Sequence, residues 1–157
     1  MLSDGACEDG GVRQEVGFIV AIPRDDAPPP GGPPSLERLR RWYDLYHGSA
    51  PVSDELKEAL VRRKQQIGQD EIIGAITPYL SVPRLLAGRD VIHWVDNTSA
   101  IAAMTKGYSS RPDSARLVHA LHAWCAVTRT SIWFEYVPSA ANAADEPSRD
   151  MGLAAAP

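Results

Sequence analysis

The sequence predicts an α/β fold, because strand-like and helix-like patterns alternate along the chain. Three apolar runs rich in β-branched and aromatic residues, at 15–22, 90–95 and 132–137, predict strands. Residues 98–104 predict a helix, and residues 114–129 carry apolar side chains at helical spacing. The chain has 157 residues, of which 44% are hydrophobic, so we expect one domain with one sizeable core.

The N-terminal part of the chain predicts two paired strands followed by an irregular region. Residues 1–7 and 15–22 flank a Gly-rich turn and are expected to pair. Residues 23–35 are rich in Pro and Gly and predict an exposed loop. Apolar residues in 36–46 have helical spacing, but the end of this segment, at 42–46, also suits a strand, so both interpretations stay open.

Two helices are expected in the middle of the chain. Ser53 can cap a helix that has acidic residues in its first turn and basic residues, at 62–64, in its later turns, an order that suits the helix dipole. A second helix is expected to begin at Glu71. Two prolines that follow it predict a kink or break near Thr77, because proline removes a backbone donor and clashes with the preceding turn.

Composition argues against several classes of protein. No apolar run approaches the roughly 20 residues of a membrane-spanning helix, and the first residues, which include Asp4, Glu8 and Asp9, do not form a signal peptide. We therefore expect an intracellular protein, in the cytoplasm or nucleus, without a membrane partner. Cys7 and Cys125 lack the spacing of a zinc site or a disulfide framework. A net charge of -4 argues against gripping nucleic acid through an overall positive field.

Four carboxylates are the candidate catalytic residues. Asp4 lies in the first expected strand, and Asp96 follows the strand at 90–95, where a junction of strand, acid and helix exposes the acid at the edge of a sheet. Glu71 and Asp145 are expected to approach from helices. Divalent cations such as Mg²⁺ prefer oxygen ligands, and phosphodiester hydrolysis by two metals requires cations about 3.5–4 Å apart. With Asp4 and Asp96 as a central pair on neighbouring strands, the four acids predict a metal-dependent nuclease.

Four short motifs surround these acids. They are SDGA at 3–6, QDEII at 69–73, WVDNTSA at 94–100 and VPSAANAADEPSR at 137–149. Together they resemble the ribonuclease H family, in particular the RNase H domains of retroelement reverse transcriptases, including those of DIRS-like elements. The resemblance covers nearly the whole chain, and its last two motifs are the most specific.

The resemblance implies a fold, an activity and partners. The fold would be an RNase H-like, five-stranded mixed sheet flanked by helices, occupying 1–150, with a loop and helix insertion at 23–66 and a C-terminal tail at 151–157. The four acids would be ligands of two Mg²⁺ or Mn²⁺ ions. The activity would be endonucleolytic cleavage of the RNA strand of an RNA/DNA hybrid, and the partner a reverse-transcriptase polymerase domain in the same polyprotein.

Several side chains near the acids are candidates for binding the hybrid. They flank the acids or follow the helix after Asp96: Gln69, Asn97, Asn142, Lys106 and Arg111. The three amides can donate to a sugar hydroxyl or a phosphate, or satisfy local backbone groups instead. The two cations, with Tyr108 between them, can contact the duplex or lie in a solvated loop.

Two other functions stay open. A catalytically silent RNase H-like module would bind nucleic acid or act as a spacer without chemistry. A nuclease of the integrase, transposase or exonuclease type would use the same superfamily fold on another substrate. Integrases usually end their acidic set with Glu, whereas this chain has Asp145. Some cellular RNases H carry a catalytic histidine before the last helix; the loop at 139–141 has none, which favours the retroelement branch.

Overall fold

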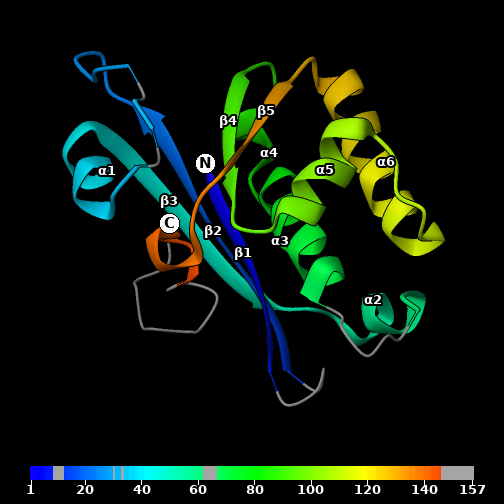
Figure 1. The fold of residues 1–157 in the computed structure, drawn as a ribbon. Helices are drawn as coiled ribbons and strands as arrows, with labels where there is room; N and C mark the ends of the chain where they lie inside the picture. The colour runs from blue at the N-terminus through cyan, green and yellow to red at the C-terminus, as the bar shows by residue number, and fades with distance from the viewer. Residues whose placement is uncertain (9–12, 30, 33, 62–66, 146–157) are drawn as a thin grey trace.

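The computed structural model describes all residues except 9–12, 30, 33, 62–66 and 146–157. Its centre is a five-stranded sheet with the strand order β3-β2-β1-β4-β5 (Figure 1). The strands are β1 (Leu2–Glu8), β2 (Arg13–Pro23), β3 (Tyr43–Pro51), β4 (Asp90–Val95) and β5 (Ser131–Tyr136). Strand β2 runs antiparallel to its neighbours β1 and β3, whereas β4 is parallel to both β1 and β5. The predicted α/β class and five-stranded mixed sheet are confirmed.

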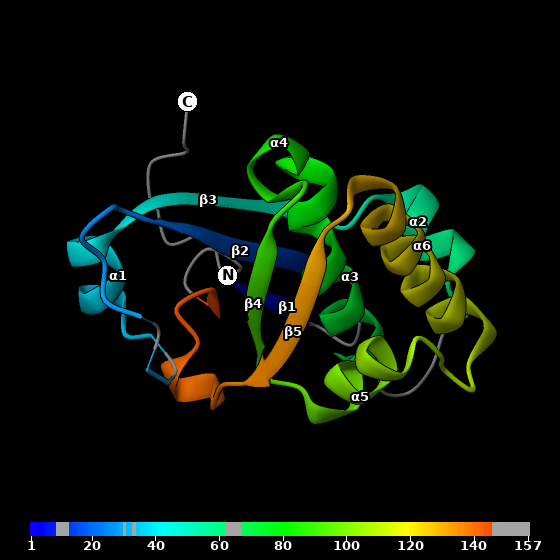
Figure 2. The ribbon, with the colours of Figure 1, turned by 90° about the horizontal axis from the view of Figure 1, so that it is seen from above.

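Helices cover both faces of this sheet. They are α1 (Leu36–Trp42), α2 (Asp54–Ala59), α3 (Ile67–Ser81), α4 (Pro83–Leu86), α5 (Thr98–Lys106), α6 (Pro112–Thr128) and the 3-10 helix η2 (Ser139–Ala141). Helices α3, α5 and α6 lie on one face, and α1 and the segment around η2 lie on the other (Figures 1 and 2). Within the described residues, no helix has the length and apolarity needed to cross a membrane.

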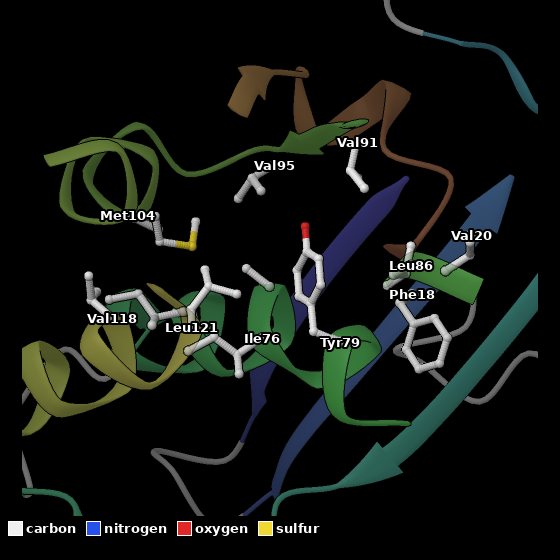
Figure 3. Packing of buried hydrophobic residues seen from close by; sticks show 13 residues of the cluster. Phe18, Val20, Ile76, Tyr79, Leu86, Val91, Val95, Met104, Val118 and Leu121 are labelled. Atoms are coloured by element: carbon white, nitrogen blue, oxygen red, sulfur yellow. The ribbon is translucent and has the colours of Figure 1, made fainter. Parts of the chain in front are cut away.

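Each face of the sheet buries its own hydrophobic cluster. The cluster on the α3 face includes Tyr79, Val91, Val95, Met104 and Leu121 (Figure 3). The cluster on the opposite face consists of Leu2, Leu39, Trp94, Val137 and Ala144. Because successive side chains of a strand point to opposite faces, β4 contributes Val91 and Val95 to the first cluster and Trp94 to the second. The two clusters hold β1 and β4 between them.

The sequence left open whether residues 36–46 form a helix or a strand, and the structure answers this question. The segment is a helix up to Trp42 and a strand from Tyr43 onwards, so both patterns were present in turn. Ser35 caps α1 by accepting a hydrogen bond from the N–H of Arg38. The region at 23–66 was expected to be a loop and helix insertion. It also contains β3, an edge strand of the sheet.

Helix α2 is shorter than predicted. Ser53 caps it as expected, with its Oγ accepting from the N–H of Leu56 at 3.3 Å. The helix ends at Ala59, because Leu60 has an extended backbone with φ -92° and ψ 143°. The basic residues at 62–64, which were expected in its later turns, lie outside the described residues.

Helix α3 differs from the prediction at both ends. It begins one turn before Glu71 and continues to Ser81, so of the kink or break expected near Thr77 the break is absent. Pro78 lies inside the helix and is fully buried. The hydroxyl of Thr77 donates to the Ile73 carbonyl at 2.8 Å. Tertiary packing of this buried turn therefore outweighs the local cost of the proline.

Candidate active site

Strands β1 and β4 place two acids side by side. Leu2 pairs with Trp94 in a parallel register. Asp4 lies two residues further along β1, and Asp96 lies two residues beyond Trp94, directly after the end of β4. The two carboxylates that were expected to form the central pair therefore lie at the same level of neighbouring strands.

Glu71 reaches this pair because α3 packs against the backbone of β1. Gly5 and Gly74 form the contact: a Cβ at Gly74 would lie 2.5 Å from the carbonyl oxygen of Asp4, and a Cβ at Gly5 would overlap the Asp70 carbonyl. Only glycine permits so close an approach. Sequence reasoning missed this role. Its signal was a glycine directly after Asp4 and another in the expected helix, three residues after Glu71.

Three carboxylates converge where these elements meet. Oxygen atoms of Asp4, Glu71 and Asp96 all lie within 4.8 Å of one another. Asp4 and Glu71 are only 6% and 5% exposed, and Asp96 is half-buried. Glu71 Oε2 and Asp96 Oδ1 are buried and have no hydrogen-bond partner within the described part of the chain. Buried acceptors are normally satisfied, so these two oxygens fit a divalent cation as their partner.

The electrostatics of Glu71 agree with this interpretation. Burial raises the pKa of Glu71 to about 9, and the nearby charges of Asp96 and Asp4 add to the effect. A hydrogen bond from the backbone N–H of Gly5 lowers the pKa, and the charge of Asp70 raises it. Three carboxylates so close together repel one another when all are ionised. A cation among them would remove that repulsion, which makes the group suited to holding a metal.

Asp145, the fourth predicted ligand, does not belong to the group of three. It is half-buried and follows η2, and its N–H donates to the Asn142 carbonyl at 3.1 Å. The side chain of Asn142 donates to the Ser3 carbonyl at 3.0 Å and accepts from the N–H of Ala144 at 3.2 Å. The segment is thus attached to β1 one residue before Asp4. The rest of its motif, residues 146–149, lies outside the described residues.

The three amide candidates all have partners inside the protein. Asn97 caps α5, where its Oδ1 accepts from two N–H groups of the first turn at 3.0 Å. Gln69 is only 2% exposed and donates to the buried carboxylate of Asp113 at the start of α6. Asn142 anchors the C-terminal segment through its bond to the Ser3 carbonyl. Each amide thus fills one of the two roles that the sequence left open, the satisfaction of groups of the protein itself, and substrate binding stays a prediction.

The cations after α5 lie on an exposed surface. Lys106 and Arg111 are exposed, and Tyr108 between them is 61% exposed. The only acidic residue between positions 97 and 134 is Asp113, which is buried. The exposed formal charges of this stretch are therefore all positive, in a chain whose net charge is -4. The turn between α5 and α6 offers a local positive surface.

Known proteins resemble this chain in structure. The comparisons with protein-family models and with curated proteins found no match, whereas the comparison with solved structures did. The N-terminal RNase H domain of Rv2228c from Mycobacterium tuberculosis, solved as a fusion with maltose binding protein, matches with a TM-score of 0.55 and 16% identity, over 94% of this chain and 88% of that one.

Two further RNase H structures give the same result. RNase H1 from Halobacterium salinarum matches with a TM-score of 0.52 and 13% identity, covering 95% of this chain and 96% of that one. LC11-RNase H1, solved in complex with an RNA/DNA hybrid, matches with a TM-score of 0.57 and 11% identity, covering 95% and 92%. At such low identities the similarity is one of fold. The chain has an RNase H-like fold.

Proposed function

We propose that this chain is a metal-dependent RNase H that cleaves the RNA strand of RNA/DNA hybrids, as part of a retroelement reverse-transcriptase polyprotein. The observation that carries the proposal is the convergence of Asp4, Glu71 and Asp96 in an RNase H-like fold, with two buried carboxylate oxygens left for a cation. The hybrid bound to LC11-RNase H1 supports the substrate class. The motifs at 94–100 and 137–149 support the retroelement context.

The chain's own residues would prepare the site for two divalent cations, Mg²⁺ or Mn²⁺. Bound cations of this kind activate the attacking water and stabilise charge on the phosphate. Asp4, Glu71 and Asp96 would hold them, with Asp145 as a fourth ligand from the segment that follows η2. Because the first three acids lie on packed elements, little reorganisation is needed when charge develops. Glu71, whose pKa is about 9 without a cation, would lose its proton on metal binding.

The surface at the turn between α5 and α6 would contact the nucleic acid backbone. Lys106 and Arg111 supply charge for phosphates, and Tyr108 supplies an aromatic face. Contacts of this kind position a duplex without reading its sequence. Replacing Lys106 or Arg111 should weaken hybrid binding and reduce its dependence on salt. Gln69, Asn97 and Asn142 would assist indirectly, by fixing the elements on which the acids lie.

Cleavage of a labelled RNA/DNA hybrid in the presence of Mg²⁺ or Mn²⁺ tests the proposal. We expect cut RNA and intact DNA, with single-stranded RNA and duplex DNA cut far less. Asp96→Asn should reduce the rate about 100-fold or more. Asp90→Asn is the matched control, because Asp90 is an exposed acid at the other end of β4. It should leave the rate unchanged.

The alternative functions give different results in the same assay. A hybrid that binds but stays intact would indicate a silent module, and cutting of duplex DNA in its place would indicate a nuclease of the integrase type. Equal rates for wild-type protein and Asp96→Asn would overturn the assignment of the acids. Coding sequence for a polymerase domain upstream of Met1 would support the polyprotein context.

A further inference from the structure

A buried chain of hydrogen bonds connects the three elements that carry the converging acids. The Oγ of Ser3 in β1 is 2.8 Å from Nε2 of His93 in β4, and Nδ1 of His93 is 3.2 Å from the hydroxyl of Tyr79 in α3. All three side chains are at most 1% exposed. Each is close in sequence to an acid: Ser3 precedes Asp4, His93 lies three residues before Asp96, and Tyr79 lies about two helical turns after Glu71.

These polar side chains lie inside an otherwise apolar core. Figure 3 shows the hydroxyl of Tyr79 directed at β4, between Val91 and Val95. The ring of His93 is packed between Tyr79 and Phe134, at centroid distances of 5.8 Å and 5.3 Å. Burial of polar groups costs free energy unless they are paired. Apolar residues would fill the same space at lower cost, so packing alone does not explain a serine, a histidine and a tyrosine here.

The chemistry of the three groups allows every bond to form with a neutral imidazole. Burial lowers the pKa of His93 well below its usual value and raises that of Tyr79 well above. A neutral imidazole has one donor and one acceptor nitrogen, while each hydroxyl can donate or accept. Both hydrogen bonds of His93 can therefore form in either tautomer of the imidazole. The series of hydrogen bonds ends at the hydroxyls of Ser3 and Tyr79, which belong to different elements.

The backbone pairing of β1 with β4 is short at this point. Leu2 with Trp94 is the single register pair between the two strands, all of whose residues are described. By contrast, β1 and β2 share seven such pairs and β4 and β5 share six. The hydrogen bond from Ser3 to His93 is thus a side-chain connection directly beside the level at which Asp4 and Asp96 lie. The bond from His93 to Tyr79 extends this connection to α3.

We propose that His93 is a positioning residue for the metal site: through Ser3 and Tyr79 it fixes the separations of β1, β4 and α3, and so the distances among the carboxylates of Asp4, Asp96 and Glu71. The inference rests on the proposed role of these acids as metal ligands. It adds a role for three residues that touch neither metal nor substrate. Loss of these hydrogen bonds would leave the fold in place but weaken the binding of a cation by the three carboxylates.

Mn²⁺ affinity, measured by calorimetry on the folded protein, tests the proposal independently of cleavage. Tyr79→Phe and Ser3→Ala each remove one hydroxyl and should weaken Mn²⁺ binding about tenfold, the order of effect seen when supporting contacts of metal ligands are lost. His93→Leu should weaken it at least as much. His93→Gln keeps one donor and one acceptor and should recover part of the affinity.

Leu121→Ala is the control for general destabilisation. Leu121 is buried in the same hydrophobic cluster, on α6, so its truncation lowers the melting temperature without touching the hydrogen bonds. It should leave Mn²⁺ affinity within about twofold of wild type, at equal or greater loss of stability. If Tyr79→Phe and Ser3→Ala also retain wild-type affinity, His93 has no positioning role.

Failure of the proposed function has a different signature. If wild-type protein binds Mn²⁺ through Asp96 but cuts no hybrid, the nuclease assignment fails while the positioning result still stands. If Asp96→Asn binds Mn²⁺ as well as wild type does, the acids are not the ligands, and both proposals are overturned.

Discussion

The two sides of the acidic site are built differently. On the α3 side, Asp4, Glu71 and Asp96 lie on packed elements, with the glycine contact and the His93 hydrogen bonds holding those elements together. On the Asp145 side, the acid follows a helix of three residues, and Asn142 connects that segment to β1. The first side is fixed by the backbone contact between β1 and the long helix α3. The second depends on a few hydrogen bonds and on the burial of Ala144.

Because of this difference, we expect the two sides to contribute to different properties of the site. Acids whose positions are set by core packing stay close together without a cation, at the cost of mutual repulsion. An acid on a short terminal segment can move with less effect on the core. We therefore expect the α3 side to determine metal affinity and the Asp145 side to matter mainly for cleavage.

Gly74→Ala should be the most damaging change. The added Cβ would lie 2.5 Å from the carbonyl oxygen of Asp4, so α3 must move away from β1. We expect a fall in melting temperature of about 10 °C or more, and loss of Mn²⁺ binding. Gly68→Ala is the control in the same helix, since a Cβ there meets no atom within 4 Å. It should be neutral or slightly stabilising. Equal melting temperatures for the two variants would refute the close contact.

Asp4→Asn and Asp145→Asn should separate the two sides directly. Asp4→Asn neutralises one of the three converging carboxylates and should weaken Mn²⁺ binding about 100-fold. Asp145→Asn should change it by no more than about threefold, while still slowing hybrid cleavage tenfold or more. Calorimetry and a cleavage assay on both variants make the comparison. Equally large losses of Mn²⁺ affinity would show that the fourth acid belongs to the same cage.

The metal-free protein should lose stability as pH rises. The folded pKa of Glu71, about 9, lies above its ordinary value of 4.5, so between these values the folded state binds more protons than the unfolded state. The contribution is present at low pH and is lost as pH rises toward 9. Melting temperatures measured in EDTA from about pH 5 to about pH 9 should therefore fall by several degrees more for wild type than for Glu71→Gln. Parallel curves would contradict the raised pKa.

Asn142→Ala should have the smallest effect. It removes the bond to the Ser3 carbonyl and the bond from Ala144, which together stabilise by about 1–2 kcal/mol. We expect slower cleavage through a displaced Asp145, with Mn²⁺ affinity unchanged. Ser139→Ala, at an exposed position of η2, is the control and should behave as wild type. A loss of Mn²⁺ affinity in Asn142→Ala would extend the metal cage to this side.

Local sequence patterns predicted most of the elements. The apolar run at 90–95 is β4, and the helices and strand that follow it begin and end within about two residues of their predicted limits. These elements could be predicted because periodicity and turn residues act over short distances. The pairing of Asp4 with Asp96 could also be predicted, because the two acids were assigned to strands that were expected to be neighbours. Asp4 lies within β1, and Asp96 comes directly after β4.

The uninterrupted α3, the exclusion of Asp145 from the group of three and the role of His93 could not be predicted in this way. Pro78 breaks a helix by local rules, and its burial in the folded protein reverses the outcome. His93 looks like any residue of an apolar strand until Ser3 and Tyr79 are placed beside it.

The acids available for the site, and the position of Asp96 directly after an apolar strand, can be recognised in the sequence alone. The tertiary structure decided which of them meet. Asp4 and Glu71 are brought together by two glycines, Gly5 and Gly74, that allow a helix to touch a strand. That contact joins parts of the chain that are far apart in sequence. Close packing of the whole core stabilises it.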